Sequence, residues 1–350
     1  MDISYISTDK LLGLVHDHGT IGKTKRTWTF MHREEGGVTL LPTYGTRYLY
    51  RGQTKRYSPC LPAIARHVKK FGRTLGELSR DEALGLLANL IRADCYCSEL
   101  RGHPVFEWAK SQSVHIPQTE FAQHYGVPTG LIDVTESLEV ALFFATHEFR
   151  DGIPHPCTEG TGILYRFDWA SAPPQVTTRF KPIAIQPFPR PFRQWAWSCE
   201  LMLGESFEAS PGLIAVEFAH DESFANEIRA LAEAGGELFP PDLMADVAAV
   251  IRRSTVFPRA IATRVLTDIT SDPGGLRETV EDLCRALEHT GFCLSDSAPR
   301  ILDEAQMAQL HTTWLAEKPS WDAAIASGFE LLFVRSRHDA TQHGTGADAQ

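Results

Sequence analysis

The sequence predicts an α+β protein with a mixed or antiparallel sheet core, flanking helices and a helical C-terminal extension. Segments rich in aromatic and β-branched residues recur as far as residue 219, and segments with apolar residues every three or four positions lie between them. From about Phe257 only the second kind continues, so we expect the strands to cease there.

Five segments have the composition of strands: residues 26–31, 38–41, 47–53, 162–168 and 213–219, the first two joined by a turn into a hairpin. Helical spacing predicts helices at residues 82–100, 105–112, 221–234, 239–253, 275–290, 303–317 and 319–327. The six prolines between Pro173 and Pro191 predict an irregular connection.

The 350 residues, 43% hydrophobic and 22% charged, have the composition of an ordinary globular protein. We expect four regions along the chain. They are an N-terminal strand or hairpin segment packing on the core (1–44), the main domain (45–255), an α-helical region (256–335) and a disordered tail (336–350).

Charge and composition exclude several classes of protein. The formal net charge of −10 argues against a sequence-independent nucleic-acid binder, although Lys55, Arg56, Arg66, Lys69 and Lys70 could form a local basic patch. Seven scattered cysteines indicate reduced thiols, and we expect a cytoplasmic protein. The sequence has neither a signal peptide nor the roughly 18 consecutive apolar residues that predict a membrane span.

The stretch from Glu120 to Thr146 concentrates polar chemistry. A first helix is ended by Gly126-Val127-Pro128, and a second, with Ser137 as its N-cap, follows. Between them we expect irregular backbone that presents His124, Tyr125, Thr129, Asp133 and Thr135. Taken singly, Asp133 and Thr135 are explained as helix caps and His124 as a core histidine. Taken together, the group favours a pocket.

Two more segments are candidates for the same site. Arg51 closes an expected strand directly before Gly52, where backbone can approach a ligand, and an arginine there suits a phosphate or carboxylate. The alternative is a surface arginine beside a turn glycine. Arg190 and the run from Arg193 to Trp197 gather guanidinium, amide and indole groups.

Standard catalytic signatures are absent from the sequence. There is no phosphate-binding Gly-Lys-Ser/Thr loop, no GxGxxG, no HExxH and no GxSxG. The 14 histidines lack metal-ligand spacing, so we expect no metal site. Any site must therefore be assembled from the three distant segments.

These segments resemble the FRG domain, a family named for its aromatic-Arg-Gly motif. The matching positions are Tyr50-Arg51-Gly52-Gln53, Pro62, Arg66, Ala122 to Thr129, Leu131, Asp133, Thr135, Ala141, Phe144-Ala145, Arg190, Gln194, Trp197, Leu238-Phe239-Pro240 and Asp242-Leu243. The resemblance spans residues 45–255. The sequence departs from the family at Gly130, Val134 and Ala196, where arginine, tryptophan and glycine are usual.

The order of these motifs is similar to that of ADP-ribosyltransferases, and this analogy implies an ADP-ribosyltransferase-like fold that uses NAD as a substrate. It assigns catalysis to Arg51, His124, Asp133 and Gln194. It assigns nucleotide binding to Arg51, Gly52, Gln53, Arg66, His124, Tyr125, Thr129, Thr135 and Arg190. His124 and Tyr125 would orient the ribose or stack on nicotinamide, and Gln194 or Asp133 would orient the acceptor.

The resemblance implies a bacterial effector, such as a toxin or phage-defence protein, that modifies a protein, nucleic-acid or nucleotide acceptor. A non-catalytic nucleotide or metabolite sensor that signals through the helical tail is the alternative. A nuclease would need carboxylates clustered around a divalent metal, which the sequence does not offer. We further expect Asp133 to be largely buried and His124, Tyr125 and Thr129 to share one cavity with Arg51. The oligomeric state stays open.

Overall fold

The computed structural model describes residues 3–21, 28–32, 38–42, 47–68, 72–150, 152–183, 188–272, 276–297 and 301–327, with the backbone alone for 28–32 and 38–42. The expected disordered tail and the basic residues Lys69 and Lys70 lie outside these ranges.

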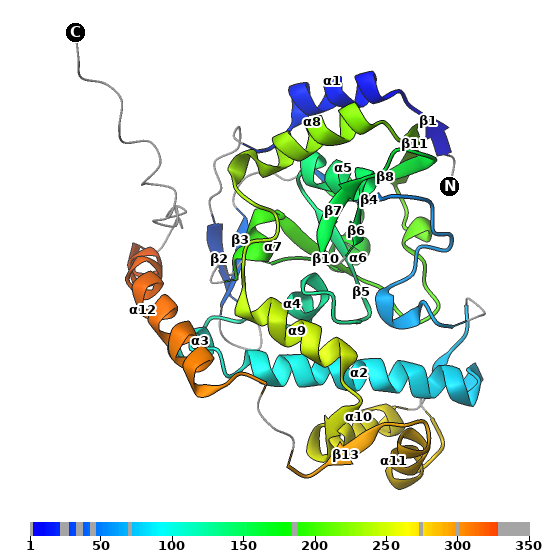
Figure 1. The fold of residues 1–350 in the computed structure, drawn as a ribbon, viewed down its shortest axis with the longest axis vertical. Helices are drawn as coiled ribbons and strands as arrows, with labels where there is room; N and C mark the ends of the chain where they lie inside the picture. The colour runs from blue at the N-terminus through cyan, green and yellow to red at the C-terminus, as the bar shows by residue number, and fades with distance from the viewer. Residues whose placement is uncertain are drawn as a thin grey trace.

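A seven-stranded mixed sheet forms the centre of the protein (Figure 1). Its spatial order is β1 (Ile3–Tyr5), β11 (Leu213–Ala219), β8 (Thr161–Asp168), β4 (Tyr48–Gln53), β5 (Leu131–Thr135), β10 (Ala196–Glu200) and β9 (Phe180–Pro182). The β1–β11 pair is parallel, and all the other neighbours are antiparallel. The α+β class with a mixed sheet and flanking helices is therefore confirmed.

The strands predicted at residues 47–53, 162–168 and 213–219 are β4, β8 and β11. Two smaller antiparallel hairpins accompany the sheet. One joins β2 (Trp28–His32) to β3 (Val38–Pro42), as the sequence predicts, and the other joins β6 (His147–Arg150) to β7 (Ile153–Pro156).

The prediction of irregular backbone around residues 124–135 is wrong for its second half, because Leu131–Thr135 form β5. The strand pairs with β10 along its whole length and with β4 at Thr135, so hydrogen bonds to distant segments stabilise it. The connection expected at Pro173–Pro191 also contains regular elements: α6 (Pro174–Thr177), β9 and the start of α7 (Pro189–Arg193).

Helices cover the sheet in two groups (Figure 1). The first comprises α5 (Leu138–Thr146), which packs on β4, together with α1 (Thr8–His18) and α8 (Glu222–Ala232), which pack on α5. The second comprises α4 (Gln118–His124), the long α2 (Arg80–Leu100) and α9 (Leu243–Arg253). The helix α1 was not predicted, and α9 begins four residues later than expected.

Local capping explains where two of these helices begin. The Ser137 side chain accepts a hydrogen bond from the Val140 N–H, so the predicted N-cap of α5 is confirmed. Ser79 and Glu82 form a reciprocal capping box at the start of α2.

The C-terminal region is mainly helical, but it is not free of strands. The short strands β12 (Val256–Pro258) and β13 (Cys293–Ser295) pair in parallel, against the expectation that strands cease near Phe257. The helices are α10 (Arg259–Ser271), α11 (Val280–His289) and α12 (Glu304–Ser327). The last replaces two predicted helices, and Pro319 lies inside it.

Aromatic contacts attach α12 to the main domain. Trp108 on α3 (Val105–Ser111) makes edge-to-face contacts with Trp314 and Trp321, at centroid distances of 5.3 and 5.8 Å. Its indole N–H also donates to Asp322 Oδ1 at 2.9 Å. The C-terminal helix is therefore packed against the same helical layer that supports α4.

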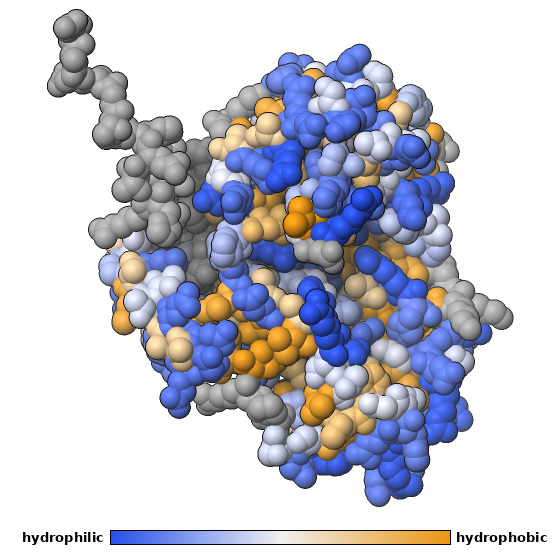
Figure 2. Space-filling view, viewed as in Figure 1, coloured by the Kyte–Doolittle hydropathy of each residue, from blue (hydrophilic) through white to orange (hydrophobic). Residues whose placement is uncertain are grey.

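The visible surface in Figure 2 is mostly polar, with apolar side chains gathered around α9. Val250 on that helix is 51% exposed. Within the described ranges, no helix combines the length and the apolar character needed to cross a membrane.

Candidate functional site

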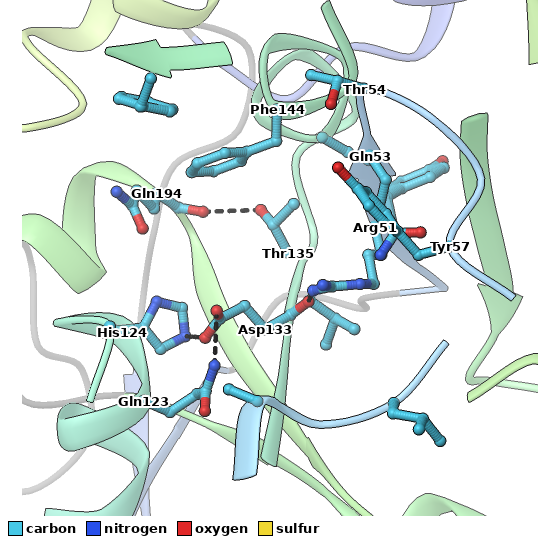
Figure 3. A pocket seen from close by; sticks show the side chains of 18 of the residues that line it. Arg51, Gln53, Thr54, Tyr57, Gln123, His124, Asp133, Thr135, Phe144 and Gln194 are labelled. Atoms are coloured by element: carbon cyan, nitrogen blue, oxygen red, sulfur yellow. Dashed lines mark hydrogen bonds and ion pairs between the residues drawn. The ribbon is translucent and has the colours of Figure 1, made fainter. Parts of the chain in front are cut away.

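A cavity of about 880 Å³ opens where β4, β5, the ends of α4 and α5, and α7 meet (Figure 3). The predicted residues that line it are Arg51, Gly52, Gln53, Arg66, His124, Asp133, Thr135, Arg190 and Gln194. They come from segments up to 143 positions apart, Arg51 being on β4 and Gln194 directly after α7. The three candidate segments thus meet at one cavity.

Two predicted residues, Tyr125 and Thr129, do not line this cavity. Tyr125 is fully buried, and its hydroxyl donates to a carboxylate oxygen of Asp242, the N-cap of α9. Thr129 is also buried, and its hydroxyl donates to Gln123 Oε1 at 2.6 Å. The expectation that Tyr125 and Thr129 share one cavity with Arg51 is therefore wrong, because both side chains are buried against other residues.

Arg51 and Arg66 bring two guanidinium groups to the cavity. Arg51 Nη1 donates to the Asp133 backbone carbonyl at 2.6 Å, and its buried Nε has no hydrogen-bond partner among the described residues. Burial lowers the pKa of Arg66, and the positive charge of Arg51 lowers it further. The two positive charges therefore repel each other, and an anion bound between them would relieve this repulsion.

Arg190 adds a third cation from α7. Its guanidinium lies over the rings of Phe239 at 4.7 Å and Tyr125 at 5.7 Å, and its buried Nε has no partner within the described part of the chain. Burial lowers the pKa of Arg190 from its usual range. An arginine nonetheless keeps its charge in proteins, so the wall that it forms is positive.

Asp133 is half-exposed rather than largely buried as expected, with 40% of its side chain accessible. It occupies the third position of β5 and lines the cavity. Oδ2 accepts a hydrogen bond from Gln123 Nε2 at 3.0 Å, and Oδ1 lies 3.2 Å from His124 Nε2. Figure 3 shows this carboxylate between the two side chains, both of which come from α4.

The His124 ring is fixed by its surroundings. Nε2 also lies 3.3 Å from the Trp197 carbonyl oxygen, and only 3% of the side chain is exposed. Because a carbonyl oxygen can only accept, Nε2 carries the proton. His124 therefore holds the Asp133 carboxylate rather than accepting a proton at this atom.

Gln194 lies on the cavity with its amide already engaged. Gln194 Nε2 donates to the Leu238 backbone carbonyl at 3.1 Å, and the Gln194 backbone carbonyl accepts from the Thr135 hydroxyl at 2.8 Å. Thr135 Oγ1 in turn accepts from the Ser137 N–H at 3.0 Å. Gln194 and Thr135 thus join β5, α5 and α7 into one wall (Figure 3).

Gly52 has a packing role that the sequence did not reveal. A Cβ at this position would lie 1.7 Å from the Ala141 carbonyl oxygen of α5. The close approach that requires glycine is therefore between β4 and α5. This contact places Arg51 and Gln53, its neighbours, beside α5.

Other lining residues escaped the sequence reasoning. Gln123 stands in the matching motif, but the sequence did not reveal its role. Its side-chain amide donates to Asp133 through Nε2 and accepts from Thr129 through Oε1. Phe144, His147, Glu148 and Phe149 enter where α5 runs into β6. Phe144 stands in the matching motif, and the sequence signalled the other three only by their position at the end of a helix that follows the candidate loop.

Metal chemistry finds no support in the described ranges, where no group of three His, Cys, Asp or Glu side chains could hold an ion. His147 also lines the cavity. Burial lowers its pKa to about 4, so it is neutral at pH 7, and its buried Nε2 has no hydrogen-bond partner among the described residues.

The fold and the site together define an α+β protein with an arginine-lined cavity at the edges of two central strands. Residues 46–152 match the family model for the FRG domain, so the chain contains an FRG domain. The matched segment runs from just before β4 to the end of β6, and it includes Arg51, His124 and Asp133. Arg190 and Gln194 lie beyond it but line the same cavity. Neither the curated proteins nor the solved structures contain a match to this chain.

Proposed function

We propose that the cavity binds the phosphates of a nucleotide, and that the protein is an NAD-dependent ADP-ribosyltransferase-like effector acting on a protein, nucleic-acid or nucleotide acceptor. The observation that carries the proposal is the convergence of Arg51, Arg66 and Arg190 on one cavity, in a protein whose formal net charge is −10. Three cations at one place in an acidic chain favour an anionic ligand.

The arginines are suited to phosphate in particular. A guanidinium presents a planar set of N–H donors that matches the oxygens of a phosphate. Arg51 Nε and Arg190 Nε are buried donors without a partner among the described residues, and such donors are rare unless a ligand or water satisfies them. The volume of about 880 Å³ is in the range of small-molecule sites.

The transfer chemistry would use Asp133. When the bond between ribose C1′ and nicotinamide breaks, the leaving nicotinamide takes the electron pair and positive charge develops on the ribose. A carboxylate held in place stabilises that charge. Asp133 is half-exposed in the cavity and is fixed by Gln123 and His124. The acceptor then attacks C1′ and releases a proton.

Gln194, which the family analogy makes catalytic, has a supporting role in this proposal. Its amide donates to the Leu238 carbonyl, so orienting an acceptor would require breaking a buried hydrogen bond. The same observation favours a second candidate function, a sensor that binds a nucleotide without transferring it. The helical C-terminal region would then pass the signal to a partner.

Two measurements test the proposal and separate its two forms. Titration calorimetry with ADP and NAD is run on the wild type, on Arg51→Ala and on Arg47→Ala. Arg47 directly precedes β4, is 65% exposed in its side chain and does not line the cavity, so it is a matched control for loss of charge. We expect Arg51→Ala to lose at least about tenfold in affinity, the size of one charge-assisted hydrogen bond. Arg47→Ala should bind like the wild type.

The second measurement is nicotinamide release and label transfer from labelled NAD in cell extract. Release that is lost in Asp133→Asn supports the transferase. Binding without release by any acceptor removes the transferase and leaves the sensor. Failure of the wild type to bind either nucleotide, or equal binding by Arg51→Ala, contradicts the proposal as a whole.

A further inference from the structure

One wall of the cavity is aromatic. Phe144, on the last turn of α5, and Phe149, on β6, both line the cavity. Their ring centroids are 6.4 Å apart with an interplanar angle of 36°. Phe239 packs behind them, 4.8 Å from Phe149 and 5.9 Å from Phe144. We call these three residues the aromatic wall.

Phe149 is accessible, as are its neighbours Glu148 and Arg150 on β6. Phe149 itself is 40% exposed and belongs to a hairpin that follows directly from a buried helix. Phe143, which packs against it from the core side at 6.2 Å, is completely buried. Phe149 therefore packs on Phe143 and Phe239 on one side, and its exposed part borders the cavity.

The aromatic wall is joined to the cationic part of the cavity by Arg190. Its guanidinium lies 4.7 Å from the Phe239 ring centroid, while Arg190 itself lines the cavity. Figure 3 shows the Phe144 ring beside the Thr135–Gln194 hydrogen bond, with Arg51 and Asp133 on the other side of that bond. Flat apolar surface and phosphate-binding donors therefore lie within one cavity.

We propose that the aromatic wall is a stacking subsite for the planar heterocycle of the nucleotide, with Phe149 as the ring that meets it. This inference rests on the proposed function, in which the arginines hold the phosphates. A nucleotide combines charged phosphates with an aromatic ring, and the cavity offers a surface for each. Stacking on phenylalanine depends little on which heterocycle stacks, because every such ring has a π-face. Adenine and nicotinamide could therefore both stack on Phe149.

The test compares ligands with and without a heterocycle. Calorimetry measures ADP and nicotinamide mononucleotide, with inorganic pyrophosphate and ribose 5-phosphate as their counterparts that lack the ring. The proteins are the wild type, Phe149→Ala, Phe149→Tyr and Ile153→Ala. Ile153 pairs with Arg150 in the same hairpin, is 59% exposed and does not line the cavity, so it controls for loss of apolar surface there.

We expect Phe149→Ala to weaken binding of the heterocycle-bearing ligand by about tenfold, the order found for one stacked base. The affinities of pyrophosphate and ribose 5-phosphate for Phe149→Ala should stay within about twofold of their wild-type values, because neither ligand has a heterocycle that could stack. Phe149→Tyr and Ile153→Ala should behave like the wild type. Whichever of ADP and nicotinamide mononucleotide is affected identifies the ring that stacks.

Three outcomes would overturn the inference. In the first, ADP and nicotinamide mononucleotide bind Phe149→Ala as tightly as the wild type, which leaves the phosphate site intact and removes the subsite alone. In the second, Phe149→Ala weakens pyrophosphate binding equally, which makes the residue structural. In the third, no phosphate ligand binds the wild type, and the proposed function then fails with the subsite.

Discussion

Replacing Gly52 by alanine tests how the central motif is built. The added Cβ would lie 1.7 Å from the Ala141 carbonyl oxygen, and 2.8 Å from both the Ala141 carbonyl carbon and the Ala145 nitrogen. Real Cβ contacts are at about 3.4–4 Å, so β4 and α5 would have to separate by roughly 2 Å. Both obstacles are backbone, which cannot rotate away as a flexible side chain can.

The expected cost follows from the packing. Overpacking of a close-packed interior costs about 1–3 kcal/mol and occasionally more, and a backbone clash of this size belongs at the upper end. We therefore expect Gly52→Ala to lower the free energy of unfolding by at least about 3 kcal/mol. Urea denaturation followed by circular dichroism measures the loss.

Gly130 provides the matched control. A Cβ there meets the Leu201 carbonyl oxygen at 3.6 Å, which is ordinary van der Waals contact. Gly130→Ala should therefore change stability by less than about 1 kcal/mol. A Gly52→Ala protein as stable as Gly130→Ala would refute the packing argument and return Gly52 to a role at the ligand.

Further substitutions test other parts of the account. Tyr125→Phe should cost about 1–3 kcal/mol in urea denaturation, because the partly buried Asp242 carboxylate loses the hydrogen bond from the Tyr125 hydroxyl. The same variant should bind ADP with unchanged affinity; a change in affinity with full stability would place Tyr125 at the ligand. Asp133→Asn should lower the free energy of unfolding by less than about 1 kcal/mol, since the side chain is 40% exposed. The variant should still abolish nicotinamide release. A folded variant that releases nicotinamide at the wild-type rate would show that Asp133 takes no part in the chemistry. Burial raises the pKa of the Glu317 carboxyl from 4.5 to about 7. The folded wild type should therefore lose stability as the pH rises from about 4.5 through 7, because the buried carboxyl must then ionise. Urea denaturation at pH 5 and at pH 8 measures this loss, which Glu317→Gln should lack. Equal pH dependence in both proteins would contradict that assignment.

The parts of the fold that the sequence predicted are those with strong local signals. The helix α2 has 21 residues with regular apolar spacing and a capping box, so neighbouring residues alone specify it. By contrast, β5 has five residues and is stabilised by β4 and β10, which lie far away in the chain. Its partners could not be read from its own composition, and the same holds for the short strands β9 and β12.

The candidate site was predictable as a set of segments, and less so as a set of side chains. The motifs indicated that Arg51, His124, Asp133 and Arg190 belong together, and all four line the cavity. The orientation of Tyr125 depends on Asp242, which is 117 positions away. The exposure of Asp133 depends on its place in β5, which the sequence did not reveal. The aromatic wall depends on how the β6–β7 hairpin folds back, which local pattern does not specify.

The most direct test of the central claim is a crystal structure of the protein with ADP bound. We expect the phosphates to lie in the cavity, within hydrogen-bond distance of Arg51 and Arg190, whose Nε atoms are buried and unpartnered among the described residues. ADP bound at another surface, with both guanidinium groups free of contact to it, would contradict the claim.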